Sequence, residues 1–533
     1  MNAMSPITFA IHDLQTGCDI ISRIPLANPQ QAAIDLDRFL DSLLTSPPDG
    51  ETYFQLLEHA RVPISFVADE LAKRYQSKAL PLAEVEEETF EQVIALWRKA
   101  ATSYARCAEN DASDEQDPAS ASRVATILHR CIHHSGMIIL EHQRARRELP
   151  WGLWLELHGY YGSAEEWGVA TLAVPDALDP LGRSTDCTTA YIAFLMCDMA
   201  GSFSLSVRDQ TLVRRWASHW SPLVSLHKAE PGEALPQYVI DLMQDMALRP
   251  VAECLQTEHL RRLDTTRLTM HINQVRHQLS QKIPPSHLEL GEDCTAGQCK
   301  RLLEHLAPAW AQARAARKYR RHATSGITQL CTGFEEMHYF ISDKEFEQPE
   351  NVRVYSRKEF ENLFAFRHQT DPQQALHVRQ EQLTYGVDSW EVVNQSANGF
   401  RLVRSTSGKK MIHGQLIALR PKDGQRFLLA KNTWLMQEKS GGLIAGIKAL
   451  PGLPVATAAR VIEQASESHG QYHRAFLLPA VPSQDTDQSL VLPQGWFRNG
   501  RVVELFTDGA WRVKLQQVLD DGPGFERVSF VVC

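Results

Sequence analysis

A short run rich in arginine, Arg317-Lys-Tyr-Arg-Arg321, could bind an anionic ligand. A guanidinium group pairs with a phosphate through two parallel hydrogen bonds, and its flat face also stacks on a nucleobase. Arginines four positions apart on a flexible joint could therefore hold one anionic, aromatic ligand from one side. Alone, such a run is weak evidence, because basic residues are common at the ends of helices.

A second polar segment, Asn394-Gln-Ser396-Ala-Asn-Gly399, is followed at once by the strand-like stretch Phe400-Arg-Leu-Val-Arg. Short turns of this composition present side-chain and backbone hydrogen-bonding groups at a surface. Gly399 is predicted to adopt a positive φ, or to let the backbone approach a ligand closely.

Taken in order, the two segments resemble the PilZ family, whose pattern is RxxxR followed by [D/N]xSxxG within a small antiparallel β-barrel. The surrounding strand-like runs are also similar to those of PilZ barrels, including a late tryptophan, Trp434, and a late glycine, Gly446. The runs concerned are Met337-His-Tyr-Phe-Ile341, Gly414-Gln-Leu-Ile-Ala-Leu, Leu429-Ala-Lys-Asn-Thr-Trp-Leu and Gly442-Leu-Ile-Ala-Gly-Ile. The resemblance covers about residues 313–452.

This resemblance implies that the ligand is cyclic di-GMP, which combines two phosphates with two flat guanines. Arg317 and Arg321 would hold phosphate and guanine, and Arg320 could substitute for either of them. The residues that would complete the pocket are Asn394, Ser396 and Gly399. The resemblance implies no catalytic residue, metal or cofactor beside the ligand.

The sequence departs from the family pattern in one respect. The stretch from Arg321 to Asn394 is much longer than in ordinary PilZ domains, and about residues 342–387 look like an insertion of helical, polar character. An insertion between two strands can lie at the surface without disturbing a barrel. It could also cover the pocket.

A cluster of histidines offers a different chemistry. His129 and His133 lie four apart on one predicted helix, so both could reach a single zinc ion. The cluster consists of His129, Cys131, His133, His134 and His142. The carboxylate pattern of a metalloprotease helix is not found near it, and local packing is the favoured interpretation.

The charge, apolar runs and cysteine spacing of the 533 residues exclude some classes of protein. The chain carries 55 basic and 64 acidic residues, a net charge of −9, which argues against binding DNA or RNA through overall charge. Its start does not resemble a signal peptide, and no apolar run reaches membrane-spanning length, so we expect a cytoplasmic protein without membrane insertion. Ten scattered cysteines without a CxxC pair indicate reduced thiols, and Cys294 and Cys299 are interpreted as incidental.

Apolar periodicity predicts a helical N-terminal half and a β-rich C-terminal half, an α+β multidomain fold. Residues 1–25 alternate and are interpreted as a strand or two, or a loose arm. Helices are expected at about 29–44, 51–61, 63–77, 83–107, 122–148, 151–168, 186–200 and 207–227. The expected domains are a helical bundle or hairpin stack at 1–228, a linking α/β segment at 229–312, the PilZ-like barrel at 313–452 and a small β domain at 453–533.

The sequence therefore predicts a receptor that is not an enzyme, which binds cyclic di-GMP and relays its level to an unidentified protein partner through the helical region. An alternative is an interaction scaffold whose PilZ-like barrel no longer binds nucleotide. A metal-dependent enzyme centred on His129 and His133 is a further alternative. The PilZ resemblance connects the protein with motility, adhesion, exopolysaccharide or biofilm control, and nothing in the sequence selects among them.

Overall fold

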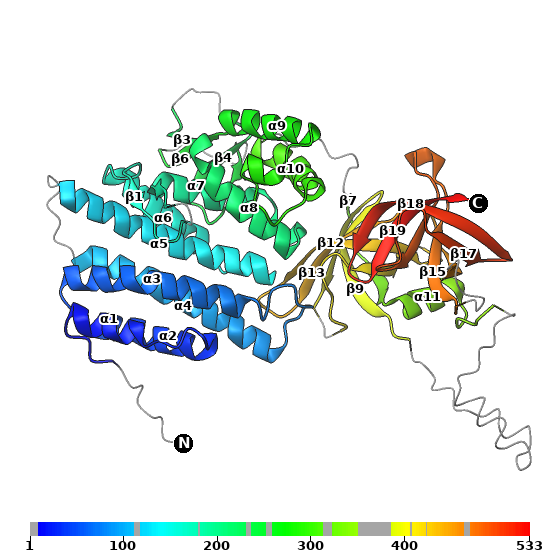
Figure 1. The fold of residues 1–533 in the computed structure, drawn as a ribbon, viewed down its shortest axis with the longest axis horizontal. Helices are drawn as coiled ribbons and strands as arrows, with labels where there is room; N and C mark the ends of the chain where they lie inside the picture. Colours follow the sequence, from blue (N-terminus) through cyan, green and yellow to red (C-terminus); the bar gives the residue numbers. More distant parts are fainter. Residues whose placement is uncertain are drawn as a thin grey trace, which may run out of the picture. The chain divides into compact units, whose positions relative to one another are not determined.

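The computed structural model confirms a helical N-terminal half followed by two β-barrels (Figure 1). The chain divides into two compact units, residues 1–317 with 436–439, and residues 318–435 with 440–533. No helix among the residues that the structure describes is long and apolar enough to cross a membrane. Those residues are 9–110, 118–179, 182–230, 236–251, 258–312, 322–349, 385–405, 408–422, 424–462 and 470–533.

Amphipathic helices that bury one face against each other build the first unit. Short polar side chains mark where they begin: Asn28 accepts a hydrogen bond from the Gln31 backbone at 3.4 Å, and Asp186 caps its helix through Thr189. The helices are α1 (Leu14–Ser22), α2 (Pro29–Thr45), α3 (Gly50–Ala72), α4 (Glu84–Asn110), α5 (Pro118–Ala145), α6 (Leu153–Glu166), α7 (Cys187–Met199) and α8 (Val207–Trp220).

Two of the helical predictions need correction. Part of the segment 1–25, interpreted as a strand or two or a loose arm, forms α1, while residues 1–8 lie outside the described residues. Asp13 caps α1, which packs so closely that a Cβ at Gly17 would lie 2.3 Å from a Leu56 methyl carbon. The two patterns at 51–61 and 63–77 belong to the single helix α3, with Pro63 inside it. Local pattern was misleading in both places because packing decides whether such a segment is helical.

A small antiparallel sheet completes the first unit, in the strand order β3-β6-β4-β5. Its strands are β3 (Ser225–Lys228), β4 (Tyr238–Asp241), β5 (Arg249–Pro250) and β6 (Leu260–Asp264), followed by the helices α9 (Thr266–Ser280) and α10 (Ala296–Trp310). A two-stranded ribbon pairs β1 (Val174–Pro175) with β2 (Ser184–Thr185). One continuous set of buried apolar side chains runs from Ile11 to Trp310, so helices and sheet share a core.

The second unit begins with a closed barrel. Its strands pair in the order β10-β13-β12-β11-β8-β9-β7, and β10 also pairs with β9, which closes the ring. The strands are β7 (His322–Ala323), β8 (Ile327–Thr332), β9 (Asp388–Ser396), β10 (Gly399–Arg404), β11 (Leu416–Arg420), β12 (Leu428–Gln437) and β13 (Leu443–Ala449). All pairings described within this barrel are antiparallel, as the PilZ resemblance predicts.

The stretch Met337–Ile341 was expected to be a strand of this barrel, and that prediction is wrong. It lies in a helix, α11 (Phe334–Ser342). Phe334, Met337 and Ile341 all pack into the core of the second unit. Their spacing of three and four residues puts them on one face of a helix, which a short apolar run cannot reveal by itself.

A second closed barrel forms the C-terminal part, in the order β14-β15-β16-β19-β18-β17. Its strands are β14 (Val455–Val461), β15 (His473–Leu478), β16 (Ser489–Pro493), β17 (Val502–Phe506), β18 (Ala510–Gly522) and β19 (Phe525–Val532). The interior is filled by its own apolar side chains, among them Leu490, Val513 and Val528.

The two barrels also share a buried cluster. Leu416, Ala418 and Leu429 from the first barrel contact a common core with Phe476 and Phe525 from the second. An ion pair accompanies it, since the Lys431 ammonium lies 2.7 Å from an Asp520 carboxylate oxygen. The barrels are therefore joined by packing as well as by the chain.

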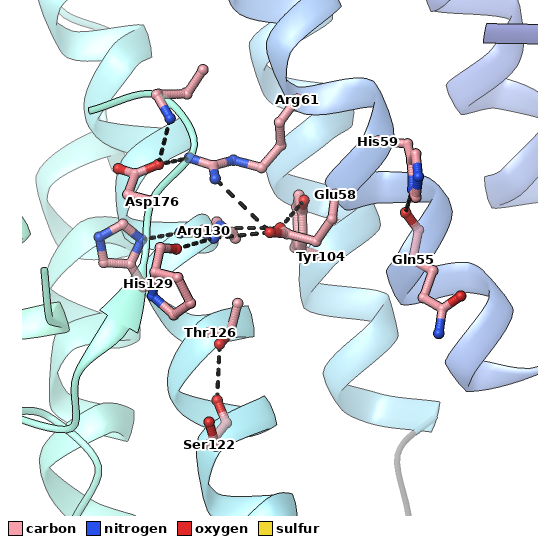
Figure 2. A network of polar contacts seen from close by, with 12 residues as sticks. Gln55, Glu58, His59, Arg61, Tyr104, Ser122, Thr126, His129, Arg130 and Asp176 are labelled. Carbon is pink, nitrogen blue, oxygen red and sulfur yellow. Dashed lines mark hydrogen bonds and ion pairs between the residues drawn. The ribbon is translucent and has the colours of Figure 1, made fainter. Parts of the chain in front are cut away.

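A network of charged side chains links α3, α4 and α5 in the first unit (Figure 2). Arg130 forms a two-pronged pair with Glu58, with both N–O distances 2.9 Å, and the Tyr104 hydroxyl donates to Glu58 at 2.7 Å. Arg61, only 1% exposed, donates to Asp176 at 2.9 Å. Two arginines and two carboxylates thus neutralise each other where isolated charges would be costly to bury.

The pKa of Glu58 shows whether burial or the pairing with Arg130 dominates. Burial disfavours the Glu58 carboxylate, but the hydrogen bonds and charge of Arg130 outweigh burial and hold the pKa of Glu58 below its ordinary value. Burial likewise opposes ionisation of Asp176, and the charge of Arg61 lowers its pKa. These carboxylates therefore stabilise the fold above their ordinary pKa, and the stabilisation is lost as the pH falls through their lowered values.

We predict that Glu58→Gln destabilises the protein by about 3–5 kcal/mol at neutral pH, because it leaves the buried Arg130 without its counter-charge. Glu70→Gln is the matched control on the same helix. Glu70 pairs with Lys73 at the surface, so its replacement should cost under ~1 kcal/mol. Urea unfolding across a pH series is the measurement. The difference in the free energy of unfolding between wild type and Glu58→Gln should become smaller in acid. Equal losses of stability for Glu58→Gln and Glu70→Gln would contradict the role assigned to the network.

Candidate ligand-binding site

The segment Asn394–Gly399 forms the tight connection between β9 and β10. Ser396 pairs with Gly399 across the hairpin, leaving two residues in the turn. The Ser396 hydroxyl donates to the Gly399 carbonyl oxygen at 3.4 Å, and the Asn398 carbonyl accepts from the Ala449 backbone on the next strand at 2.9 Å. The predicted turn is thus present, held at the end of the hairpin that closes the barrel.

Gly399 serves a different purpose from one of those predicted. It is not among the glycines with positive φ. A Cβ at this position would lie 3.2 Å from the Ser396 hydroxyl oxygen and 3.4 Å from the Ile447 carbonyl oxygen. The glycine therefore allows close packing of the turn against β13 without an unusual backbone conformation.

Asn394 and Arg401 lie directly opposite each other on β9 and β10. The side-chain oxygen of Asn394 and Nε of Arg401 are both shielded from solvent, and neither has a hydrogen-bond partner among the residues that the structure describes. An unsatisfied buried polar atom costs about 1–3 kcal/mol. Two of them on adjacent strands are the arrangement expected where a ligand supplies the missing partners.

Asn394 and Arg401 begin a row of residues that crosses the sheet from β9 through β10 and β13 to an aromatic ring on β12. Arg401 pairs with Gly446 on β13, and the indole of Trp434 on β12 covers this glycine, since a Cβ there would lie 1.8 Å from the indole nitrogen. The missing side chain lets Trp434 meet Arg401, whose guanidinium carbon lies 5.9 Å from the ring centre. A cation beside an aromatic ring offers both charge and a flat face.

Lys448 adds a further positive charge at the edge of this row. It pairs with Gly399, two residues along β13 from Gly446, and its side chain is exposed.

Arg404, on the same strand as Arg401, has a structural role. It is buried against Trp390 and forms an ion pair with Asp388 at 2.7 Å, so it stabilises the barrel.

Sequence reasoning named part of this candidate site, and its role in binding stays a prediction. Asn394, Ser396 and Gly399 are brought together as predicted by the hairpin. Trp434 was noticed only as part of the resemblance, and Arg401 and Lys448 were missed. The position of Arg401 two residues after the glycine was the available signal for it, whereas Lys448 could be found only from the strand register.

The predicted arginines Arg317, Arg320 and Arg321, and residues 350–384 of the predicted insertion, lie outside the described residues. The described chain resumes at β7, where His322 pairs with Gln395 and Ala323 pairs with Asn394. The strand that immediately follows the arginine run is therefore hydrogen-bonded beside the strand that carries Asn394.

The histidines of α5 contribute to packing. His129 accepts a hydrogen bond from Arg130 at 3.0 Å, and burial, reinforced by the charge of Arg130, lowers the pKa of His129 to about 3. His134 stacks on Trp97 and on Tyr104. Within the described ranges no three potential ligand side chains gather as a metal site, so the metal-enzyme alternative gains no support.

The barrel and its hairpin motif agree with a family comparison: the chain is similar to the PilZ-domain family, and a model described as a middle PilZ domain matches residues 238–382. That model comes from the cyclic-di-GMP receptor FimW, whose N-terminal domain model matches residues 18–231 and whose C-terminal β-barrel model matches residues 457–533. The three matches follow each other in order. The hairpin with Asn394 lies between the second and third matched ranges, so its role is inferred from geometry.

A curated relative agrees with these matches. The cyclic-di-GMP receptor FimW of Pseudomonas aeruginosa is 24% identical over 528 residues, covering 92% of this chain and 86% of the relative. No solved structure matches the chain.

Gly446→Ala should test the arrangement around Trp434. The added methyl group has no room beside the indole, so we expect a loss of about 1–3 kcal/mol in stability or an expelled Trp434 ring. Gly386→Ala is the control, because a Cβ at Gly386 meets nothing within 4 Å. Urea unfolding and near-ultraviolet circular dichroism report the two effects, and a Gly446→Ala protein unchanged in both would refute the packing described.

Proposed function

We propose that this chain is a cyclic di-GMP receptor whose ligand binds on the first barrel, at the row formed by Asn394, Arg401, Gly446 and Trp434. The observation that carries the proposal is the pair of unsatisfied buried polar atoms beside an aromatic ring, at the family's motif turn. The name of the curated relative, a cyclic-di-GMP receptor, supports the same ligand.

The chemistry of the row suits a guanine nucleotide. The Asn394 oxygen can accept a hydrogen bond from the amino or N1–H group of guanine. Arg401 can donate to guanine O6 and N7 or to a phosphate, and the indole of Trp434 can stack on a base. Lys448 and the run Arg317, Arg320 and Arg321 would neutralise the two phosphates. Ser396 and Gly399 would shape the turn beneath the ligand.

The proposed receptor binds its ligand without converting it. Ser396 donates its hydroxyl proton to a backbone carbonyl, and no base is paired with it among the described residues. We further propose that the protein needs no metal or other cofactor and acts in the cytoplasm, where this messenger is made. The bound state would be relayed to a protein partner through the helical unit, without contact with DNA or RNA.

Titration calorimetry of the full chain with cyclic di-GMP tests the receptor proposal. We expect micromolar or tighter binding, about −8 kcal/mol or better, and recovery of intact ligand afterwards. GTP serves as a control that carries guanine and phosphates without the cyclic dinucleotide shape. Absence of heat and of a thermal shift at saturating ligand would instead favour a scaffold whose barrel no longer binds nucleotide, and turnover of the ligand would overturn the non-enzymatic role.

The arginine run is tested by comparing Arg321→Ala with Arg314→Ala. Loss of a two-pronged arginine–phosphate contact should cost ~2–4 kcal/mol, whereas loss of a nearby charge that only attracts the ligand should cost under ~1 kcal/mol and vanish at high salt. Binding isotherms at two salt concentrations separate the two. If both variants weaken binding equally and salt erases both effects, the run is merely a charged segment.

Arg401→Ala tests the residue that the strand register adds to the proposed site. We expect its cyclic di-GMP affinity to fall by about 1.5–3 kcal/mol, the range for a hydrogen bond to a charged group. Arg426→Ala, an exposed arginine before β12, removes the same charge elsewhere on the barrel and should leave affinity nearly unchanged. Equal affinities for both variants would exclude Arg401 from the site. Unfolding curves of both variants show whether a loss of affinity is caused by misfolding.

A further inference from the structure

Two cysteines of the first unit lie unusually close together. The sulfur atoms of Cys294 and Cys299 are 3.0 Å apart, with the Cys299 thiol donating to the Cys294 sulfur. Both are free thiols, as are the other cysteines that the structure describes. The interpretation of this pair as incidental, drawn from sequence spacing, did not include this contact.

The surrounding structure fixes the position of Cys294. It ends a loop that two contacts fasten to α8: the Trp216 indole nitrogen donates to the Leu290 carbonyl at 2.9 Å, and Arg215 pairs with Asp293 at 2.6 Å. Cys299 lies in the first turns of α10, which Thr295 caps. The loop and the helix therefore hold the two sulfurs against each other.

The two thiols differ in accessibility. Cys294 is 9% exposed and lies between the exposed residues Asp293 and Thr295, whereas Cys299 is fully buried. Burial, followed by the contact with Cys294, raises the pKa of Cys299 to about 12, so this thiol stays protonated. The Cys299 thiol is directed at the Cys294 sulfur, and the Cys294 thiol donates to the carbonyl oxygens of Leu290 at 3.6 Å and Gly291 at 3.5 Å. Cys294 is thus the sulfur that meets an oxidant first.

We propose that Cys294 and Cys299 are a modification site that forms a reversible intramolecular disulfide, with a low-molecular-weight disulfide such as oxidised glutathione as the oxidant. The sulfurs need to approach by only about 1 Å to reach a bond length of about 2.05 Å. The site belongs to the first unit and does not depend on the nucleotide proposal.

The reaction proceeds in two exchange steps. The Cys294 thiolate attacks one sulfur of oxidised glutathione, forming a mixed disulfide and releasing one glutathione thiolate. Cys299 then attacks the Cys294 sulfur and passes its proton to the departing glutathione sulfur, so the second glutathione leaves as a thiol. Two protein thiols are oxidised and one glutathione disulfide is reduced to two thiols, so atoms and electrons balance.

The test uses the full-length protein in oxidised glutathione, quenched with acid, alkylated, digested and mapped by mass spectrometry. We expect a peptide pair joined through Cys294 and Cys299, which separates again in excess reduced thiol. Cys533, which is exposed, is the internal control for an active oxidant. Cys294 and Cys299 both remaining open to alkylation after unfolding, while Cys533 carries glutathione, would overturn the proposal.

Single replacements test the order of the steps. Cys299→Ser should trap Cys294 as a stable mixed disulfide with glutathione, whereas Cys294→Ser should leave Cys299 unmodified. Cys533→Ser should still form the internal disulfide, which excludes a route through Cys533. Rapid glutathione addition to Cys299 in Cys294→Ser would refute the proposed entry through Cys294. Mapping of the wild-type protein decides the main point even if a variant fails to fold.

Discussion

Antiparallel pairing between β9 and β10 is the interaction on which the barrel with the candidate site depends. The same hydrogen bonds that close the first barrel also bring Asn394 opposite Arg401 and place the motif turn at the barrel's end. Closing a barrel removes the exposed strand edges that would otherwise pair with other chains. Fold stability and site geometry are therefore set by one hairpin, and a change in its register would disturb both.

The helical unit contains buried arginines that need carboxylate partners. Its helices are long and largely buried, and they enclose arginines that the apolar core could not hold alone. The Arg130–Glu58 pair and the Arg61–Asp176 pair satisfy those charges from three elements: α3, α5 and the loop after β1. Pairs of this kind contribute little net stability compared with apolar packing, but they penalise every arrangement in which a partner is missing. They thus favour one alignment of these helices.

The sequence predicted the class of fold and the local parts of the site, and failed where distant residues decide the outcome. Periodic apolar residues revealed helices such as α2 and α4, and the hairpin was visible because Asn394, Ser396 and Gly399 are neighbours in the chain. Met337–Ile341 was misread because a five-residue, mainly apolar run fits a strand as well as a helix. Arg401, Lys448 and Trp434 become neighbours only through the strand order β10-β13-β12, which local pattern does not determine. The contact between Cys294 and Cys299 likewise depends on how the loop before α10 is fastened to α8.

The apolar cluster shared by the two barrels bears on how the chain can be dissected. A fragment ending near residue 452 would lose Phe476 and Phe525, and Leu416, Ala418 and Leu429 would face water where they now face another domain. Such a fragment exposes an apolar patch and tends to self-associate. Cloning boundaries that look natural from the strand pattern would then yield aggregates. A soluble fragment that carries the candidate site should retain both barrels, to the end of β19, together with the arginine run Arg317–Arg321 before β7.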